Sequence, residues 1–133
     1  MGYRSDVVVV FEAKDTDKLL KAAKDWDKKY NLDGHFTVEN LIDDADKNMI
    51  SKDKKYYLLV WNSIEWYAAS IADITGEKIH KNQEFFESLN DYGIKYDLVR
   101  IGEEMGDSVI LGNLGSGVTL MTYENEMTAI SAS

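Results

Sequence analysis

Two short stretches have residue types and spacing that could do chemistry, and the first is GNLGSGVT at 112–119. It follows a strand-like run, as does the phosphate-binding loop G-x-x-x-x-G-K-[ST], in which the lysine meets the phosphates. Val118 stands at the lysine position, and VTLMTY follows where the N-terminus of a helix would be needed to hold an anion. The glycines therefore predict a hairpin loop rather than a nucleotide site.

The second stretch is DADKN at 44–48, which resembles the start of a calcium loop. Asp44, Asp46 and Asn48 would supply the first oxygen ligands. The sixth position requires glycine for a sharp turn and holds Met49, and the twelfth requires a bidentate glutamate and holds Lys55. An acidic loop is the better interpretation.

No other pattern indicates catalysis. The chain has no cysteine, and its two histidines, His35 and His80, do not form a metal-binding motif. Adjacent Glu103 and Glu104 would point to opposite faces of a strand, which disfavours a two-carboxylate active site. We expect a non-catalytic protein without a metal or cofactor, and the absence of cysteine is consistent with a cytoplasmic location.

Charge is distributed unevenly along the sequence. The net charge is −9, and residues 97–133 carry six acids against a single cation, Arg100. Such a one-signed region repels nucleic acid and anionic membranes and favours a cationic partner. The alternative is a solvated face that serves solubility alone. The carboxylates expected to contact a partner are those of Glu103, Glu104, Asp107, Glu124 and Glu126.

The aromatic residues concentrate in YYLLVWNSIEWY at 56–67. Alternate residues of the first half are apolar on both faces, which predicts a strand covered on both sides, so most of these rings should be core. Trp66 and Tyr67 follow the expected strand end, where amphipathic rings can be half-exposed. Because Trp and Tyr supply interface hot spots, we expect this pair to anchor a partner.

Periodicity predicts one α+β domain over residues 1–133. No apolar run reaches the roughly 18 residues of a membrane span. A two-layer sandwich is expected, with a mostly antiparallel sheet, helices on one face and a ferredoxin-like variant as the first guess. Thr16, Thr37 and Ser63 are the expected caps of the first three helical segments. The expected strands are 6–12, 56–61, 94–102, 107–113 and 118–124. The expected helices are 16–30, a short one within 37–49 whose apolar stripe runs from Val38 to Ala45, 63–71 and 76–90. Residues 46–55 are expected to form a loop, and residues 127–133 to fray.

Three patches, MGYRSDV, YYLLVWNSIEWY and DLVRIGEE, resemble small uncharacterised proteins of bacteriophages and prophages. The chain departs from that pattern after Tyr67. The resemblance implies an accessory protein acting inside a bacterial host cell, and it carries no functional residues. Together with the acidic third, it suggests an anti-CRISPR-like inhibitor that occludes the cationic nucleic-acid-binding surface of a host defence nuclease.

Two other functions remain open from the sequence. If Arg4 and Arg100 converge, they could hold a small anionic signalling molecule, but pairing of each with a neighbouring acid such as Asp6 or Glu103 is the favoured interpretation. An immunity protein that neutralises a toxin would use the same acidic contacts on a different target.

Overall fold

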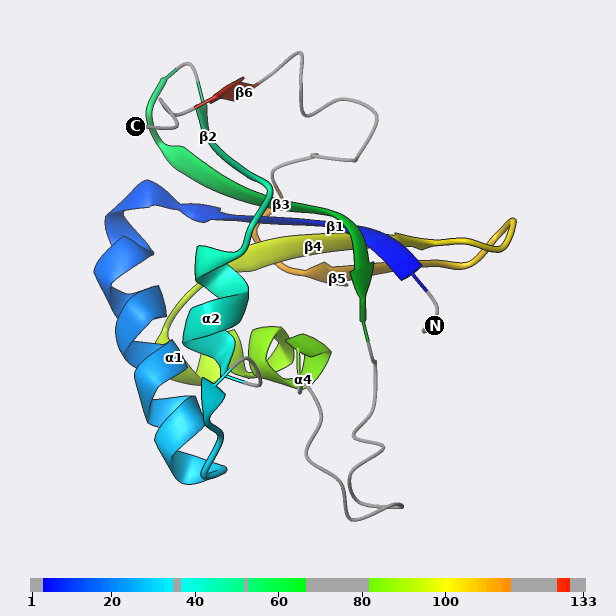
Figure 1. The fold of residues 1–133 in the computed structure, drawn as a ribbon. Helices are drawn as coiled ribbons and strands as arrows, with labels where there is room; N and C mark the ends of the chain where they lie inside the picture. Colours follow the sequence, from blue (N-terminus) through cyan, green and yellow to red (C-terminus); the bar gives the residue numbers. More distant parts are fainter. Residues whose placement is uncertain (1–3, 35–36, 52, 67–81, 116–126, 130–133) are drawn as a thin grey trace.

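The structure is a computed structural model, and it describes residues 4–34, 37–51, 53–66, 82–115 and 127–129. Helices and strands lie in two layers, with α1, α2 and α4 on one side of a sheet (Figure 1). The elements in chain order are β1 (Arg4–Glu12), η1 (Ala13–Asp15), α1 (Thr16–Lys29), α2 (Val38–Asp43), β2 (Lys47–Ser51), β3 (Tyr56–Glu65), α4 (Asn82–Glu87), η3 (Ser88–Tyr92), β4 (Tyr96–Gly102), β5 (Ser108–Gly112) and β6 (Met127–Ala129). The α+β prediction is confirmed.

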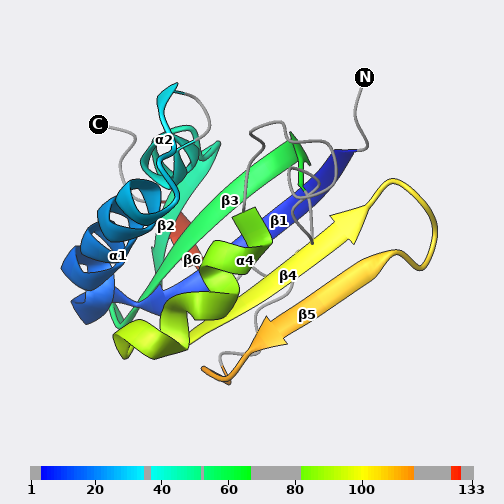
Figure 2. The same cartoon turned by 90° about the horizontal axis from the view of Figure 1, so that it is seen from below.

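The described strands form one six-stranded sheet in the order β5-β4-β1-β3-β2-β6. Every neighbouring pair is antiparallel. From β1 to β4 the chain follows β-α-β-β-α-β with the spatial order β4-β1-β3-β2, the connectivity of a ferredoxin-like unit. Figure 2 shows β5 extending this unit beside β4, and β6 pairs with β2 at the other edge.

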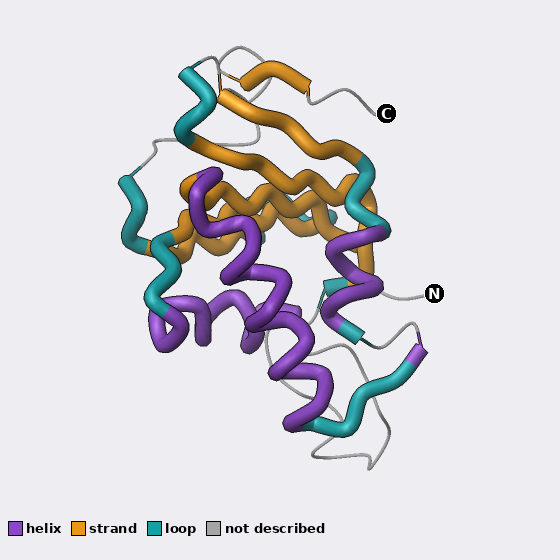
Figure 3. Tube along the Cα trace, turned by 90° about the vertical axis from the view of Figure 1, so that its left-hand side faces the viewer, coloured by secondary structure: helices purple, strands orange, loops and turns teal. Residues whose placement is uncertain are grey.

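The main core lies between the sheet and the helices. Val7, Val9 and Phe11 alternate along β1 and face this side, because successive strand residues point to opposite faces. From α1, Leu19, Ala23 and Trp26 meet them at helical spacing. Figure 3 shows the helices grouped on one side of the strands. Each fully buried large apolar side chain contributes about 1.5–3 kcal/mol to folding.

The opposite face of the sheet also has a buried centre. Val8 and Val10 of β1 pack with Leu58 and Val60 of β3, and Met49 of β2 joins them. The continuous apolar runs of β1 and β3 thus match strands that are covered on both faces, as the sequence predicts.

The start of α2 depends on a buried carboxylate from another helix. Asp27 of α1 accepts hydrogen bonds from the backbone N–H groups of Val38 (2.6 Å) and Glu39 (3.1 Å). Thr37 caps the same terminus as predicted, because its hydroxyl oxygen accepts from the Asn40 N–H at 3.1 Å. Charge-assisted bonds at a helix N-terminus are strong, so Asp27 fixes α2 against α1.

Several local predictions were wrong. Residues 46–55 were expected to form a loop, but they contain β2, whose alternation is weak because Lys47 and Asn48 are exposed. The strand expected at 56–61 continues to Glu65, and Ser63 adopts a φ of 57° within it instead of capping a helix. Asp15, not Thr16, holds the N-cap position of α1.

The chain ends differ from expectation as well. Residues 127–133 were expected to fray, but Met127–Ala129 forms β6 and pairs with β2. The NDYG stop signal is confirmed, since η3 ends at Gly93 with a φ of 74°. The predicted strand 118–124, the helical turn expected after Ser63 from residue 67 on, and the first part of the helix expected at 76–90 lie outside the described residues.

Candidate functional site

The β4–β5 hairpin brings three of the predicted contact residues together. Glu103, Glu104 and Asp107 lie in its connecting loop, where both glutamates are exposed. The Glu103 carboxylate accepts from the backbone N–H of Arg4 at 2.8 Å, which ties the loop to the start of β1. Met105 stands fully exposed at the tip between them. The loop therefore presents carboxylates around one flexible apolar side chain.

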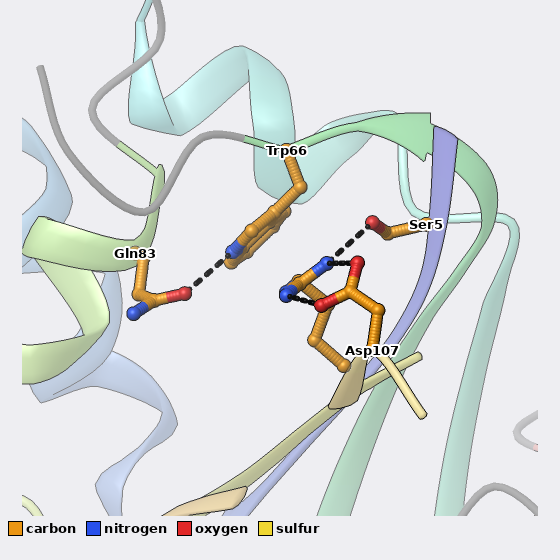
Figure 4. A network of polar contacts seen from close by, with 5 residues as sticks. Ser5, Trp66, Gln83 and Asp107 are labelled. Atoms are coloured by element: carbon orange, nitrogen blue, oxygen red, sulfur yellow. Dashed lines mark hydrogen bonds and ion pairs between the residues drawn. The ribbon is translucent and has the colours of Figure 1, made fainter. Parts of the chain in front are cut away.

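Arg100 and Asp107 form an ion pair across the base of this loop. Arg100 Nη2 lies 2.8 Å from Asp107 Oδ1, and Nη1 lies 3.3 Å from Oδ2, so the contact is bidentate. Arg100 Nη1 also donates to the buried Ser5 hydroxyl at 3.0 Å. Figure 4 shows the contacts that join Ser5 and Asp107 in this network, together with the separate contact between Trp66 and Gln83. The pair joins β1, β4 and the hairpin loop into one unit.

The alternative of an anion site between Arg4 and Arg100 lacks the required geometry. Arg100 pairs with Val7 in the register, so its side chain lies on the helix-facing side of the sheet, where it contacts Ser5. Arg4 precedes Ser5 in the same strand, and adjacent strand residues point to opposite faces. Arg4 Nη1 donates to the Ser63 carbonyl at 3.2 Å. The two arginines do not converge.

Arg4 does line a surface cavity of about 300 Å³. The same cavity is lined by Asp6 and Glu103, so two carboxylates share it with one guanidinium. The two carboxylates would repel an anionic ligand placed in this cavity. The cavity is a poor site for a phosphate or a carboxylate.

Trp66 is buried, so the expectation of a half-exposed ring was wrong, and burial argues against Trp66 as a partner anchor. Only 5% of its surface is exposed. Its ring stacks on Phe86 of α4, with the centroids 5.9 Å apart, and its Nε1–H donates to Gln83 Oε1 at 3.3 Å. Trp66 instead attaches the end of β3 to α4. Tyr67, Glu124 and Glu126, the other predicted contacts, lie outside the described residues.

Sequence reasoning missed the apolar part of this surface. Ile110 of β5 is 75% exposed and Ile101 of β4 is 40% exposed. Both lie on the face away from the helices, since Ile110 pairs with Val99 and Val99 pairs with Val8. The apolar run Val109–Leu111 was the available signal, but it does not tell which face of the strand lacks cover. We call Ile101, Ile110, Met105 and the acids Glu103, Glu104 and Asp107 the hairpin surface.

Three further findings concern the described part of the chain. No group of three or more potential metal-ligating side chains occurs among the described residues. A second cavity, of about 230 Å³, lies between α1, α2 and β3, where Phe11 and Tyr57 stack at 5.3 Å. None of the described helices is long and apolar enough to cross a membrane.

Comparison with known proteins gave no match to a protein-family model, to a curated protein or to a solved structure. The resemblance to phage and prophage proteins therefore stays a prediction.

Proposed function

We propose that this chain is a non-catalytic protein that binds a cationic surface of another protein through the hairpin surface. The observation that supports this most is the exposed loop with Glu103, Glu104 and the fully exposed Met105. Residues 97–115 carry four acids and one cation, a net charge of −3, and that cation, Arg100, is already paired with Asp107. A surface of this kind attracts cationic partners electrostatically and adds apolar contact area once they dock.

The partner class we propose is a nucleic-acid-binding effector of bacterial defence against mobile elements. Such effectors must present a cationic surface to bind phosphates, and an acidic protein seated on that surface would exclude nucleic acid. The phage-type sequence patches favour this partner over a toxin, for which the contacts would be the same. The small-molecule alternative receives no support from Arg4, which shares its cavity with two carboxylates.

The test is binding to a panel of purified defence nucleases, measured at low and high salt, with displacement of their nucleic acid as a second readout. The double variant E103K/E104K should weaken binding at least about tenfold, since each lost charge contact contributes on the order of 1 kcal/mol. The matched control is D17K/D25K, which reverses two exposed acids of α1 and also changes the net charge from −9 to −5.

The control should lose no more than about threefold in affinity, because only long-range attraction changes. Equal losses in both double variants would contradict the hairpin as the contact. Binding that does not respond to salt would contradict an electrostatic surface altogether.

A further inference from the structure

Within the described part of the chain, β5 is an edge strand, and no strand pairs with its side away from β4. It lies at the end of the sheet order, next to β4 alone. The Gly102 N–H donates to the Asp107 carbonyl at 2.8 Å, and the Asn113 N–H donates to the Tyr96 carbonyl at 2.9 Å. Hydrogen-bonded and non-hydrogen-bonded pairs alternate in an antiparallel ladder, so these two bonds determine which residues of β5 bond to β4. This phase directs the N–H and C=O groups of Val109 and Leu111 toward β4 and those of Ser108 and Ile110 away from it. Gly112, with a φ of 108°, is not extended and ends the regular ladder.

This edge lacks the devices that usually protect one. Natural edge strands carry lysine, proline, an inward charge or a bulge, each of which discourages pairing with another chain. The sequence of β5 is SVILG, without a charge or a proline, and its register with β4 is regular from Ser108 to Leu111. The ladder becomes irregular only at its end, where the N–H groups of Asn113 and Leu114 both donate to the Tyr96 carbonyl. Ile110, at its centre, is the most exposed of the large apolar residues within the described strands. An unprotected apolar edge of this kind is suited to receiving another strand.

Charge identifies the occupant. The acidic loop of Glu103, Glu104 and Asp107 leads directly into β5, so it lies beside one end of any strand added there. No lysine follows Lys95 in the sequence. A second copy of this chain would bring a further net charge of −9. The negative charge of this region attracts a basic segment and repels a second copy of the chain.

We propose that β5 captures an extended basic segment of the partner by strand addition, which deepens the proposed function and rests on it. The added strand donates to and accepts from the outward backbone groups of Ser108 and Ile110. An apolar side chain of the segment lies against Ile110 on the face away from the helices, and its lysines or arginines lie along the acidic loop. Backbone pairing supplies affinity, and these two side-chain contacts supply specificity.

The probe is a synthetic ten-residue peptide with three lysines followed by alternating valine and threonine. A second version carries N-methyl groups on alternate backbone amides, which removes donors without changing charge. Titration up to about 1 mM, followed through the amide resonances of the ¹⁵N-labelled chain, covers weak binding. The unmodified peptide should shift the amides of Ser108 and Ile110, and the methylated peptide should bind at least about tenfold more weakly, as expected for lost backbone hydrogen bonds.

The matched protein variants are Ile110→Pro and Ile110→Thr. Proline removes an N–H that points away from β4, so it is tolerated at this edge position while blocking strand addition. Threonine keeps the donor and should lose less than about threefold in affinity, because only part of the apolar contact is removed. If the proline variant does not fold, the pair of peptides still decides the question.

Three results would overturn the inference. The first is equal affinity for the plain and methylated peptides, which means that charge alone is recognised and leaves the proposed function intact. The second is no shift at Ser108 or Ile110. The third is a dimer of the wild-type chain in sedimentation that becomes a monomer in Ile110→Pro, which means that a second copy fills the edge. A different measurement tests the proposed function, which fails if E103K/E104K binds the nuclease panel as tightly as the wild-type chain does.

Discussion

The pairing of Arg100 with Asp107 predicts that removing Asp107 alone destabilises the protein more than removing both partners. Arg100 is 11% exposed, whereas Asp107 is 34% exposed, so the arginine depends more on its partner. In Asp107→Ala the guanidinium keeps only the Ser5 hydroxyl among the contacts that form this network. Removing one member of a buried pair costs about 3–5 kcal/mol, and surface pairs contribute about 0–1 kcal/mol. The partial exposure of Asp107 places the expected loss at about 2 kcal/mol.

The double variant R100M/D107A should lose only about 1 kcal/mol. Methionine replaces the buried stem of Arg100 without a charge that needs a partner, and well-packed apolar replacements of ion pairs are often neutral. Arg100→Met alone should also cost about 1 kcal/mol, because the exposed part of the Asp107 carboxylate can be hydrated. The four proteins make a double-mutant cycle with a coupling energy of about 2 kcal/mol.

Urea unfolding at 25 °C measures the four free energies of unfolding. Glu104→Ala is the control, since this exposed residue of the same loop should change stability by less than about 0.5 kcal/mol. The reasoning is refuted if R100M/D107A is less stable than Asp107→Ala. It is also refuted if Asp107→Ala lies within about 0.5 kcal/mol of wild type, because the pair would then behave as a surface contact.

Two further predictions concern stability elsewhere. Asp27→Ala should lose about 3 kcal/mol in urea unfolding, since two charge-assisted bonds at the start of α2 disappear and one of the donors is buried. Asp25→Ala, on the exposed side of the same helix, should lose under about 0.5 kcal/mol, and equal losses would contradict the capping role. Burial raises the pKa of Tyr57 and of Tyr96, with Glu87 a further cause for Tyr96. Because the neutral phenols are favoured in the folded state, this contribution is complete below the unfolded pKa near 10 and is lost as the pH rises above it. As the pH rises through that range, the free energy of unfolding should fall while tyrosinate absorbance rises. An increase in the free energy of unfolding would refute the raised tyrosine pKa values.

Much of the fold follows from local patterns in the sequence. The valine run of β1 and the continuous apolar run at the start of β3 predict central strands, and both are buried on two faces. Thr37 and the NDYG segment mark helix ends because capping and positive φ depend on neighbouring residues. The strand β2 was missed because only Met49 and Ser51 of its five residues are buried, which leaves too little alternation to detect.

The candidate site was predictable only in part. Glu103, Glu104 and Asp107 could be selected from charge alone, since they lie in a run without lysine. The exposure of Ile110 depends on which strand lies at the edge of the sheet. The burial of Trp66 depends on α4 packing against the end of β3. Both are properties of tertiary arrangement, on which local patterns carry no information.

The central position of β1 sets a delay during synthesis. This strand is translated before both of its neighbours, yet β3 begins at Tyr56 and β4 is complete only at Gly102. At about 5–20 residues per second, roughly 5–20 s pass between the emergence of β1 and that of its last neighbour. Until Glu65 is synthesised the four valines have neither sheet partner complete, and until Gly102 is synthesised they still lack β4. Such non-local pairing is slow to form. The growing chain therefore carries an apolar strand without its full set of partners for several seconds, and such exposed surface is prone to aggregation before the sheet closes.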